Sequence, residues 1–150
     1  MKFTHLHVHS HYSLLDGLTK IDELIQKAVD EGCTSLAITD HGVMYGVIEF
    51  YQKCKKAGIK PIIGVEVYLA PGSRFDKNSR SDERNYHLVL LAKDEVGYHN
   101  LIKLTSIAHL EGFYYKPRID WEVLEKHKDG LIALTACLAG EIPKLIELTS

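Results

Sequence analysis

The chain has 150 residues, of which 45% are hydrophobic, and this is enough apolar material for one globular core. Its net charge of −2 excludes the overall basic character of a general nucleic-acid binder, so a polyanionic partner would need a local site. The three cysteines are widely spaced, and no apolar run is typical of a signal peptide or membrane span. These features predict a protein of the reducing cytoplasm without membrane contact.

Strand and helix patterns alternate along the chain, with the first helix capped by Thr19 and a short late helix capped by Asp120. The expected strands are 3–9, 35–39, 61–68, 86–92 and 130–135. The expected helices are 21–29, 43–57, 94–110, 120–128 and one that begins near 140. This alternation predicts an α/β fold with a parallel sheet, either open and doubly wound or part of a (β/α) barrel. In both architectures, functional residues gather at the C-terminal ends of the strands.

Four histidines alternate along the first expected strand: His5, His7, His9 and His11. Successive side chains of a strand point to opposite faces, so the four imidazoles would share one face. Neutral imidazole is a common metal ligand, and the row therefore indicates a metal site. The structural alternative is a solvated edge strand whose histidines are satisfied by hydrogen bonds.

Further potential ligands follow the ends of the other expected strands: Asp16, His41, Glu66 and Cys137. Glu66 is the most informative of them, because a carboxylate inside an apolar strand is costly unless it is paired or metal-bound. His87 fits the rule less well, since it lies at the start of its strand. The mixture of nitrogen, oxygen and sulfur donors is suited to zinc, manganese or iron.

Several other polar residues have simpler structural interpretations. Asp40 is expected to cap the helix that follows it. His99, His109 and His127 are expected at the surface, and Cys33 and Cys54 in or beside the core.

The cations of the charged loop over residues 72–85 are candidates for contact with DNA phosphates: Arg74, Lys77, Arg80 and Arg84. Acidic neighbours in the same loop nearly cancel their charge, so a solvated loop is the better interpretation.

Three short motifs resemble those of the PHP (polymerase and histidinol phosphatase) domain family: His7-Val8-His9, Thr39-Asp40-His41-Gly42 and Gly64-Val65-Glu66. Longer segments are similar to the N-terminal region of bacterial replicative DNA polymerase III alpha subunits. These segments are 5–10, 12–17, 111–118 and 137–142. The resemblance covers essentially the whole chain.

This resemblance implies a distorted (β/α)7 TIM-like barrel with up to three metal ions. Residues 1–150 would be the N-terminal portion of the domain, with about five β/α units and an unclosed barrel. One metal would be held by His7 and His9, and Glu66 would bridge it to a second metal. The resemblance assigns His87 and Cys137 to the second metal and Asp16 and His41 to the third.

Three residues near the expected ligands are not themselves expected to bind metal. Asp40 and His5 would lie behind the ligands and support them, and His11 would not be a ligand. The family's closing Asp-x-His pair has no counterpart in this sequence. No residue beyond the metal ligands is assigned a catalytic role.

The resemblance implies metal-dependent phosphodiester hydrolysis, and in the polymerase branch a 3′→5′ exonuclease that proofreads the primer. Polymerisation would need magnesium held by a pair of carboxylates, which we do not find here, so this fragment alone should be inactive. One alternative is a metal-stapled scaffold that stabilises the polymerase and docks a separate exonuclease subunit. Another is a stand-alone PHP phosphoesterase, and an amidohydrolase fits the motifs poorly. The presence of every mapped ligand favours the active interpretation, with DNA and other replicase subunits as partners.

Overall fold

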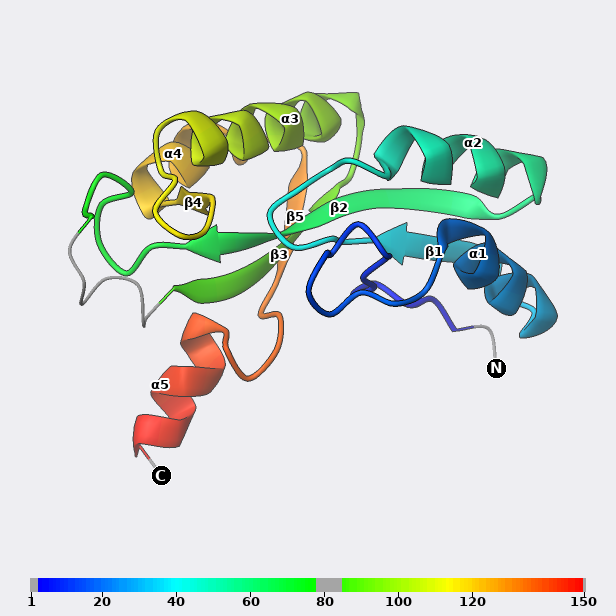
Figure 1. Ribbon diagram of the computed structural model, residues 1–150, viewed down its shortest axis with the longest axis horizontal. Helices are drawn as coiled ribbons and strands as arrows, with labels where there is room; N and C mark the ends of the chain where they lie inside the picture. Colours follow the sequence, from blue (N-terminus) through cyan, green and yellow to red (C-terminus); the bar gives the residue numbers. More distant parts are fainter. Residues whose placement is uncertain (1–2, 78–84, 150) are drawn as a thin grey trace.

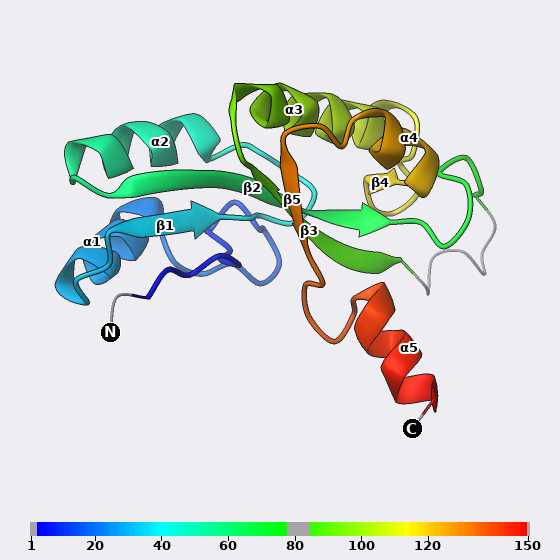
Figure 2. The same ribbon diagram turned by 180° about the vertical axis from the view of Figure 1, so that it is seen from behind.

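Five strands form one mixed sheet with helices packed against it in the computed structural model, which describes residues 3–77 and 85–149 (Figures 1 and 2). The strands are β1 (Ser35–Ile38), β2 (Lys60–Leu69), β3 (Tyr86–Ala92), β4 (Arg118–Ile119) and β5 (Leu131–Leu134). The helices are α1 (Ile21–Asp30), α2 (Val47–Lys56), α3 (Glu95–Leu110), α4 (Trp121–Lys126) and α5 (Glu141–Thr149). The predicted α/β class is confirmed, although the short strand β4 was not expected.

The direction of the strands corrects the expected parallel sheet. The strand order is β1-β2-β3-β5, and β4 also pairs with β2. Strands β1 and β4 run parallel to β2, whereas β3 is antiparallel to both β2 and β5. Parallel neighbours need a crossover, but the described part of the β2–β3 connection, 70–77 and 85, contains no helix. The start of β3 therefore lies beside the end of β2.

Residues 3–9 were expected to form the first strand, and this prediction is wrong. They run beside β1 but do not form a regular strand. The Ala37 N–H donates to the His5 carbonyl, and the Thr39 N–H donates to the Val8 carbonyl. The interval of three residues from His5 to Val8 is thus paired with an interval of two residues from Ala37 to Thr39. One extra residue is accommodated in the N-terminal segment, as in a β-bulge. The Val8 N–H is satisfied by the Thr39 hydroxyl at 2.8 Å instead of a backbone carbonyl.

The core lies mainly between the sheet and α1, α2 and α3. Figure 1 shows α2 and α3 along the same face of the sheet. On β2, Val65, Val67 and Leu69 pack with the apolar side of α3. Because side chains alternate along a strand, Glu66 is directed to the opposite face. Cys33 and Cys54 belong to the other large cluster, beneath α1 and α2, as expected.

Helix starts follow the sequence signals at α3 and α4 but not at α1 and α2. The Asp120 carboxylate caps α4 by accepting from the Val123 N–H, as predicted. In contrast, α1 begins after Lys20 without a side-chain cap, so the expected Thr19 cap is wrong. Asp40 is also no cap, because α2 begins only at Val47. No helix in the described parts of the chain is long and apolar enough to cross a membrane.

Arg74 is buried rather than solvated, which corrects its assignment to a solvated or DNA-contacting loop. Its guanidinium makes ion pairs with Glu111 at 2.8 Å and with Asp120 at 3.1 Å. A cation bound in this way has few donors left for a phosphate. Lys77 is exposed, while Arg80 and Arg84 lie outside the described residues.

Candidate metal centre

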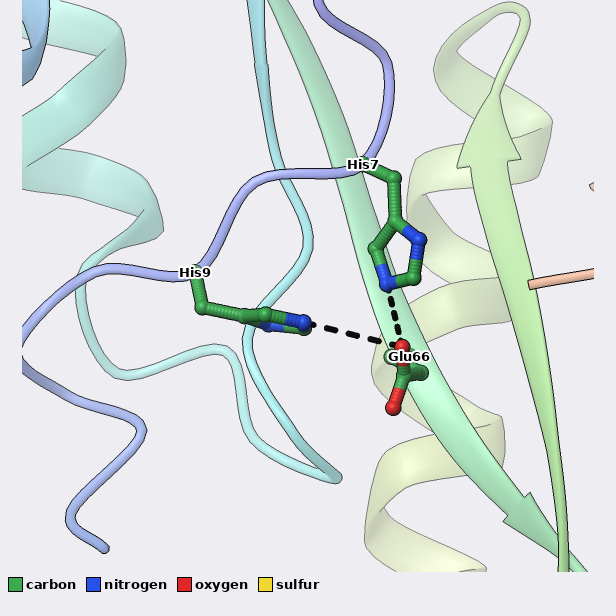
Figure 3. Close-up of side chains that lie close together, drawn as sticks. All are labelled: His7, His9 and Glu66. Atoms are coloured by element: carbon green, nitrogen blue, oxygen red, sulfur yellow. Dashed lines mark hydrogen bonds and ion pairs between the residues drawn. The ribbon is translucent and has the colours of Figure 1, made fainter. Parts of the chain in front are cut away.

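A single buried carboxylate, that of Glu66, lies at the centre of four imidazoles. The side chain is 1% exposed. His7 and His9 approach its Oε2 atom, with His9 Nε2 at 3.6 Å and His7 Nε2 in closer contact (Figure 3). On the other side, Nδ1 of His41 lies 2.8 Å and Nδ1 of His87 lies 2.6 Å from Oε1. The four histidines come from three separate segments of the chain.

His41 and Glu66 are held together by backbone pairing that continues beyond the end of β1. The Glu66 N–H donates to the Asp40 carbonyl at 3.1 Å, and the Gly42 N–H donates to the Glu66 carbonyl at 2.8 Å. Gly42 has a φ of +63°, a conformation that favours glycine. This turn sends the chain away from the sheet immediately after His41.

The antiparallel direction of β3 explains how His87 reaches the site from the start of its strand. His87 is paired with Tyr68, two residues beyond Glu66 on β2. Residues directly opposite in a ladder share a face, as do residues two apart along one strand. Glu66, Tyr68 and His87 therefore face the same side.

Of the four N-terminal histidines, His7 and His9 are directed at Glu66 (Figure 3), whereas His5 and His11 have other contacts. The ring of His5 is turned to solvent and to Glu31, 4.0 Å away. His11 packs against Tyr12 instead. The bulge in this segment interrupts the strict alternation on which the shared face was predicted.

Asp40 supports the loop that precedes the site. Its carboxylate accepts from the Ser10 N–H at 2.6 Å and from the Ser13 hydroxyl at 2.7 Å. The Ser13 oxygen in turn accepts from the His41 N–H at 3.2 Å. Asp40 thus fixes the backbone of His41 without contacting the histidine ring.

Asp16 and Cys137 flank the two sides of the cluster. The Asp16 carboxylate lies 2.8 Å from Nε2 of His41. Its loop closes tightly at Gly17, where a Cβ atom would lie 1.9 Å from the Ser10 carbonyl oxygen. Cys137 follows β5, which runs in the same direction as β2, and its Sγ lies 3.6 Å from Nδ1 of His87.

The electrostatics of the cluster follow from one buried anion among several imidazoles. Burial would raise the pKa of Glu66, but contacts with His41 and His87 outweigh it, so the pKa lies below its usual value. The Glu66 carboxylate, opposed by burial, raises the pKa of His41. For His9, burial and the neighbouring His41 lower the pKa.

The unsatisfied atoms of the cluster fit a metal site better than an ion-pair network. His41 Nδ1 and Glu66 Oε1 are close, yet both are buried and lack a hydrogen-bond partner among the described residues, as does His9 Nδ1. The potential ligand atoms form two sets, and within each set all atoms lie within 4.8 Å of one another. The first set comes from His7, His9 and Glu66, and the second from His41, Glu66 and His87. Imidazole and carboxylate donors in this arrangement suit divalent metal ions.

A cleft of about 460 Å³ opens in front of the second set. Its lining includes Asp16, His41 and His87, together with three residues that sequence reasoning did not place there: Tyr68, His109 and Lys116. Tyr68 had a signal, since it is two residues from Glu66 on the same strand. His109, expected at the surface, is half-buried, and its Nε2 lies 3.0 Å from the Gly42 carbonyl oxygen.

Comparison with known proteins gives a consistent result. A model of the PHP domain family matches residues 5–149. The DNA polymerase III subunit alpha of Borreliella burgdorferi is 57% identical over 146 residues, which are 97% of this chain and 13% of that protein. The corresponding protein of Aquifex aeolicus is 54% identical over 144 residues, which are 92% of this chain and 12% of that protein. The chain thus spans about an eighth of the length of these relatives.

One solved structure, assigned as a metal-dependent phosphoesterase of Bifidobacterium adolescentis, shares the fold. The TM-score is 0.50 at 18% identity, with 72% of this chain and 35% of that protein covered. This partial match supports the predicted α/β class and the predicted incomplete barrel.

Proposed function

The chain belongs to the PHP domain family, and from this premise we propose that it is the N-terminal, metal-binding portion of a DNA polymerase III alpha subunit whose PHP site hydrolyses phosphodiester bonds. High identity to alpha subunits across nearly the whole chain supports the first part. The complete protein would be a DNA-directed DNA polymerase with a separate magnesium site. Its partners would be DNA and other replicase subunits, and its location the cytoplasm.

The observation that carries the proposed hydrolysis is the position of Glu66 between two sets of imidazoles. A carboxylate shared by both sets would keep up to three cations close together, with Asp16 beside His41 and Cys137 beside His87. Zinc, manganese or iron bound there would supply Lewis acidity to a phosphoryl group and lower the pKa of a water molecule. A proofreading 3′→5′ exonuclease is the activity that we propose for this chemistry.

The chain's own residues orient this site rather than transfer protons. Asp40 and Ser13 fix the backbone that carries His41. Backbone pairing fixes Glu66 relative to the same histidine. Fixed ligands reduce the reorganisation that a reaction requires, which is how a scaffold contributes to rate.

The test uses the full-length protein loaded with zinc, manganese or iron. Digestion of a primer with a mismatched 3′ end is followed without nucleotides, and metal content is measured in the same samples. The double variant His7→Ala/His9→Ala should lose nucleotide release and part of the bound metal. His99→Ala, an exposed histidine on α3, is the matched control and should behave as wild type.

Each alternative has its own outcome. Bound metal without DNA hydrolysis would contradict the exonuclease and support a metal-stapled scaffold. Hydrolysis of p-nitrophenyl phosphate but not of the primer would support a phosphoesterase of small substrates. Digestion that persists in the double variant would show that another site or protein is responsible.

A further inference from the structure

Lys116 lies in the cleft beside the metal centre without belonging to it. It lines the same cavity as Asp16, His41 and His87. Its ammonium nitrogen is 5.4 Å from the centre of the Tyr68 ring, and that ring meets the His87 ring edge-on at 5.2 Å. One aromatic ring therefore separates this cation from a candidate metal ligand.

The charge of Lys116 is not neutralised within the described residues. None of their carboxylates lies within the 4.0 Å of an ion pair, whereas Lys53 has two such partners and Arg74 has three. Contact with the face of Tyr68 orients an ammonium group but leaves its N–H donors free. The ammonium group of Lys116 is therefore available to an anion that enters the cleft.

Tyr115, the residue before Lys116, lies in a strained turn that leaves its aromatic ring exposed. Tyr114 and Lys116 exchange two backbone hydrogen bonds, of 3.1 Å and 2.7 Å, around Tyr115. Tyr115 has a φ of +57°, which is uncommon for a residue other than glycine and carries a conformational cost. Its side chain is nevertheless 69% exposed, so burial of the ring does not offset this cost.

The turn is anchored on its C-terminal side. Pro117 lies against the turn after His41, where a Cβ at Gly42 would be 2.7 Å from the proline ring. Arg118 is fully buried and donates to the Gly112 carbonyl at 3.0 Å. The exposed ring and the cation are therefore presented by a fixed segment beside the cleft.

We propose that Lys116 and Tyr115 form a strand-binding wall of the metal cleft for single-stranded DNA. Lys116 would contact a phosphate adjacent to the one that is cleaved, and Tyr115 would stack on a base. Stacking of a base on an aromatic side chain stabilises the binding of single-stranded DNA and tolerates any sequence. The inference rests on the proposed phosphodiesterase and names how that site would hold its polymer.

The kinetic test compares a polymer with a minimal substrate in the metal-loaded, full-length protein. The substrates are decathymidylate and the p-nitrophenyl ester of thymidine 5′-monophosphate. In Lys116→Met, the KM for decathymidylate should rise about tenfold more than the KM for the ester. The slope of log KM for decathymidylate against log salt concentration should decrease by about 1, as expected for one lost phosphate contact. Lys116→Arg should restore most of the affinity, and Lys55→Met, an exposed lysine on α2, is the matched control.

Tyr115→Gly tests the ring separately, because glycine accepts the positive φ of the turn. It should raise the KM for decathymidylate about tenfold, within the range expected for one lost stacking contact. An equal rise of the KM for decathymidylate and for the ester would overturn the proposal. Loss of bound metal in Lys116→Met would also overturn it, as would an unchanged KM for decathymidylate in both variants.

Photo-crosslinking keeps this proposal separate from the proposed hydrolysis. Decathymidylate with 5-iododeoxyuridine near its 3′ end should crosslink to residues 113–117, and less so in Lys116→Met. Crosslinks to residues 113–117 in a wild-type protein without hydrolytic activity would contradict the proposed hydrolysis but support DNA binding by the strand-binding wall. Hydrolytic activity with crosslinks only outside residues 113–117 would contradict the strand-binding wall and support the proposed hydrolysis.

Discussion

Two buried carboxylates of this molecule, Glu66 and Asp120, are surrounded in opposite ways. Asp120 is 3% exposed and accepts from the backbone N–H groups of Arg74 and Val123 and from the Arg74 guanidinium. Glu66 is equally buried but faces imidazoles, and one of its oxygens has no hydrogen bond among the described residues. The first group is satisfied by the protein, whereas the second retains an unsatisfied acceptor that a bound cation would satisfy.

This difference gives a physical criterion for separating structural from functional carboxylates. A buried carboxylate costs free energy unless donors or cations compensate it. Where arginine and backbone N–H groups do so, removal of the carboxylate should affect stability. Where imidazoles with unsatisfied atoms surround it, removal should affect metal binding.

The largest expected effect is that of Glu66→Gln. The amide keeps the shape of the side chain but removes the charge shared by both sets of ligands. Bound metal should fall sharply, and any hydrolysis that depends on the metal should fall by several orders of magnitude. Metal analysis and primer digestion of the full-length protein measure the two effects.

The control for this variant is Glu23→Gln, an exposed carboxylate on α1. It should retain the metal and the activity of the wild type. Full metal content in Glu66→Gln would remove the distinction between the two carboxylates.

Asp120→Ala should show the opposite pattern. It leaves the buried Arg74 guanidinium short of partners, a change that typically costs about 3–5 kcal/mol. Hydrogen exchange of the backbone amides over residues 112–126 would measure this loss, while metal content per folded protein should stay unchanged. Glu122→Ala removes a more exposed partner of the same arginine and should change the exchange of these amides much less.

The third prediction concerns pH at Asp120. Burial would raise its pKa, but the hydrogen bonds from Arg74 and Val123 and the nearby guanidinium charge lower it. The stabilisation is therefore present above the ordinary pKa of an aspartate, about 3.9, and is lost as the pH falls through the lower folded value. The protection factors of the amides over residues 112–126, which correct the exchange rate for its intrinsic pH dependence, should fall in acid, and Asp120→Asn should flatten this dependence. Parallel pH profiles for wild type and variant would contradict the prediction.

The ligand candidates could be named from the sequence, but their arrangement could not. Motifs and strand ends identified His7, His9, His41 and Glu66, because these residues follow rules that are local in the chain. His87 did not fit, since the antiparallel direction of β3 depends on which strands pair, not on any local pattern.

Two other errors have the same origin in tertiary contacts. The alternation of histidines ended at a bulge that exists only against β1, so His5 is turned away from the cluster. The charge of Arg74 was assigned to solvent because its buried partner Asp120 lies 46 residues further along the chain. Composition and periodicity contain no information about such distant pairs.

The smallest expected effect is at His109, which touches neither carboxylate but holds the turn after His41. Its Nε2 lies 3.0 Å from the Gly42 carbonyl, and this contact joins α3 to the turn at the end of β1. Loss of one such hydrogen bond costs about 1 kcal/mol, so His109→Ala should weaken metal binding roughly fivefold without removing a ligand. His109→Gln keeps an N–H donor and should recover part of the loss. Competition with a metal-binding dye measures both variants, and equal affinity for wild type and His109→Ala would show that the turn is held without this contact.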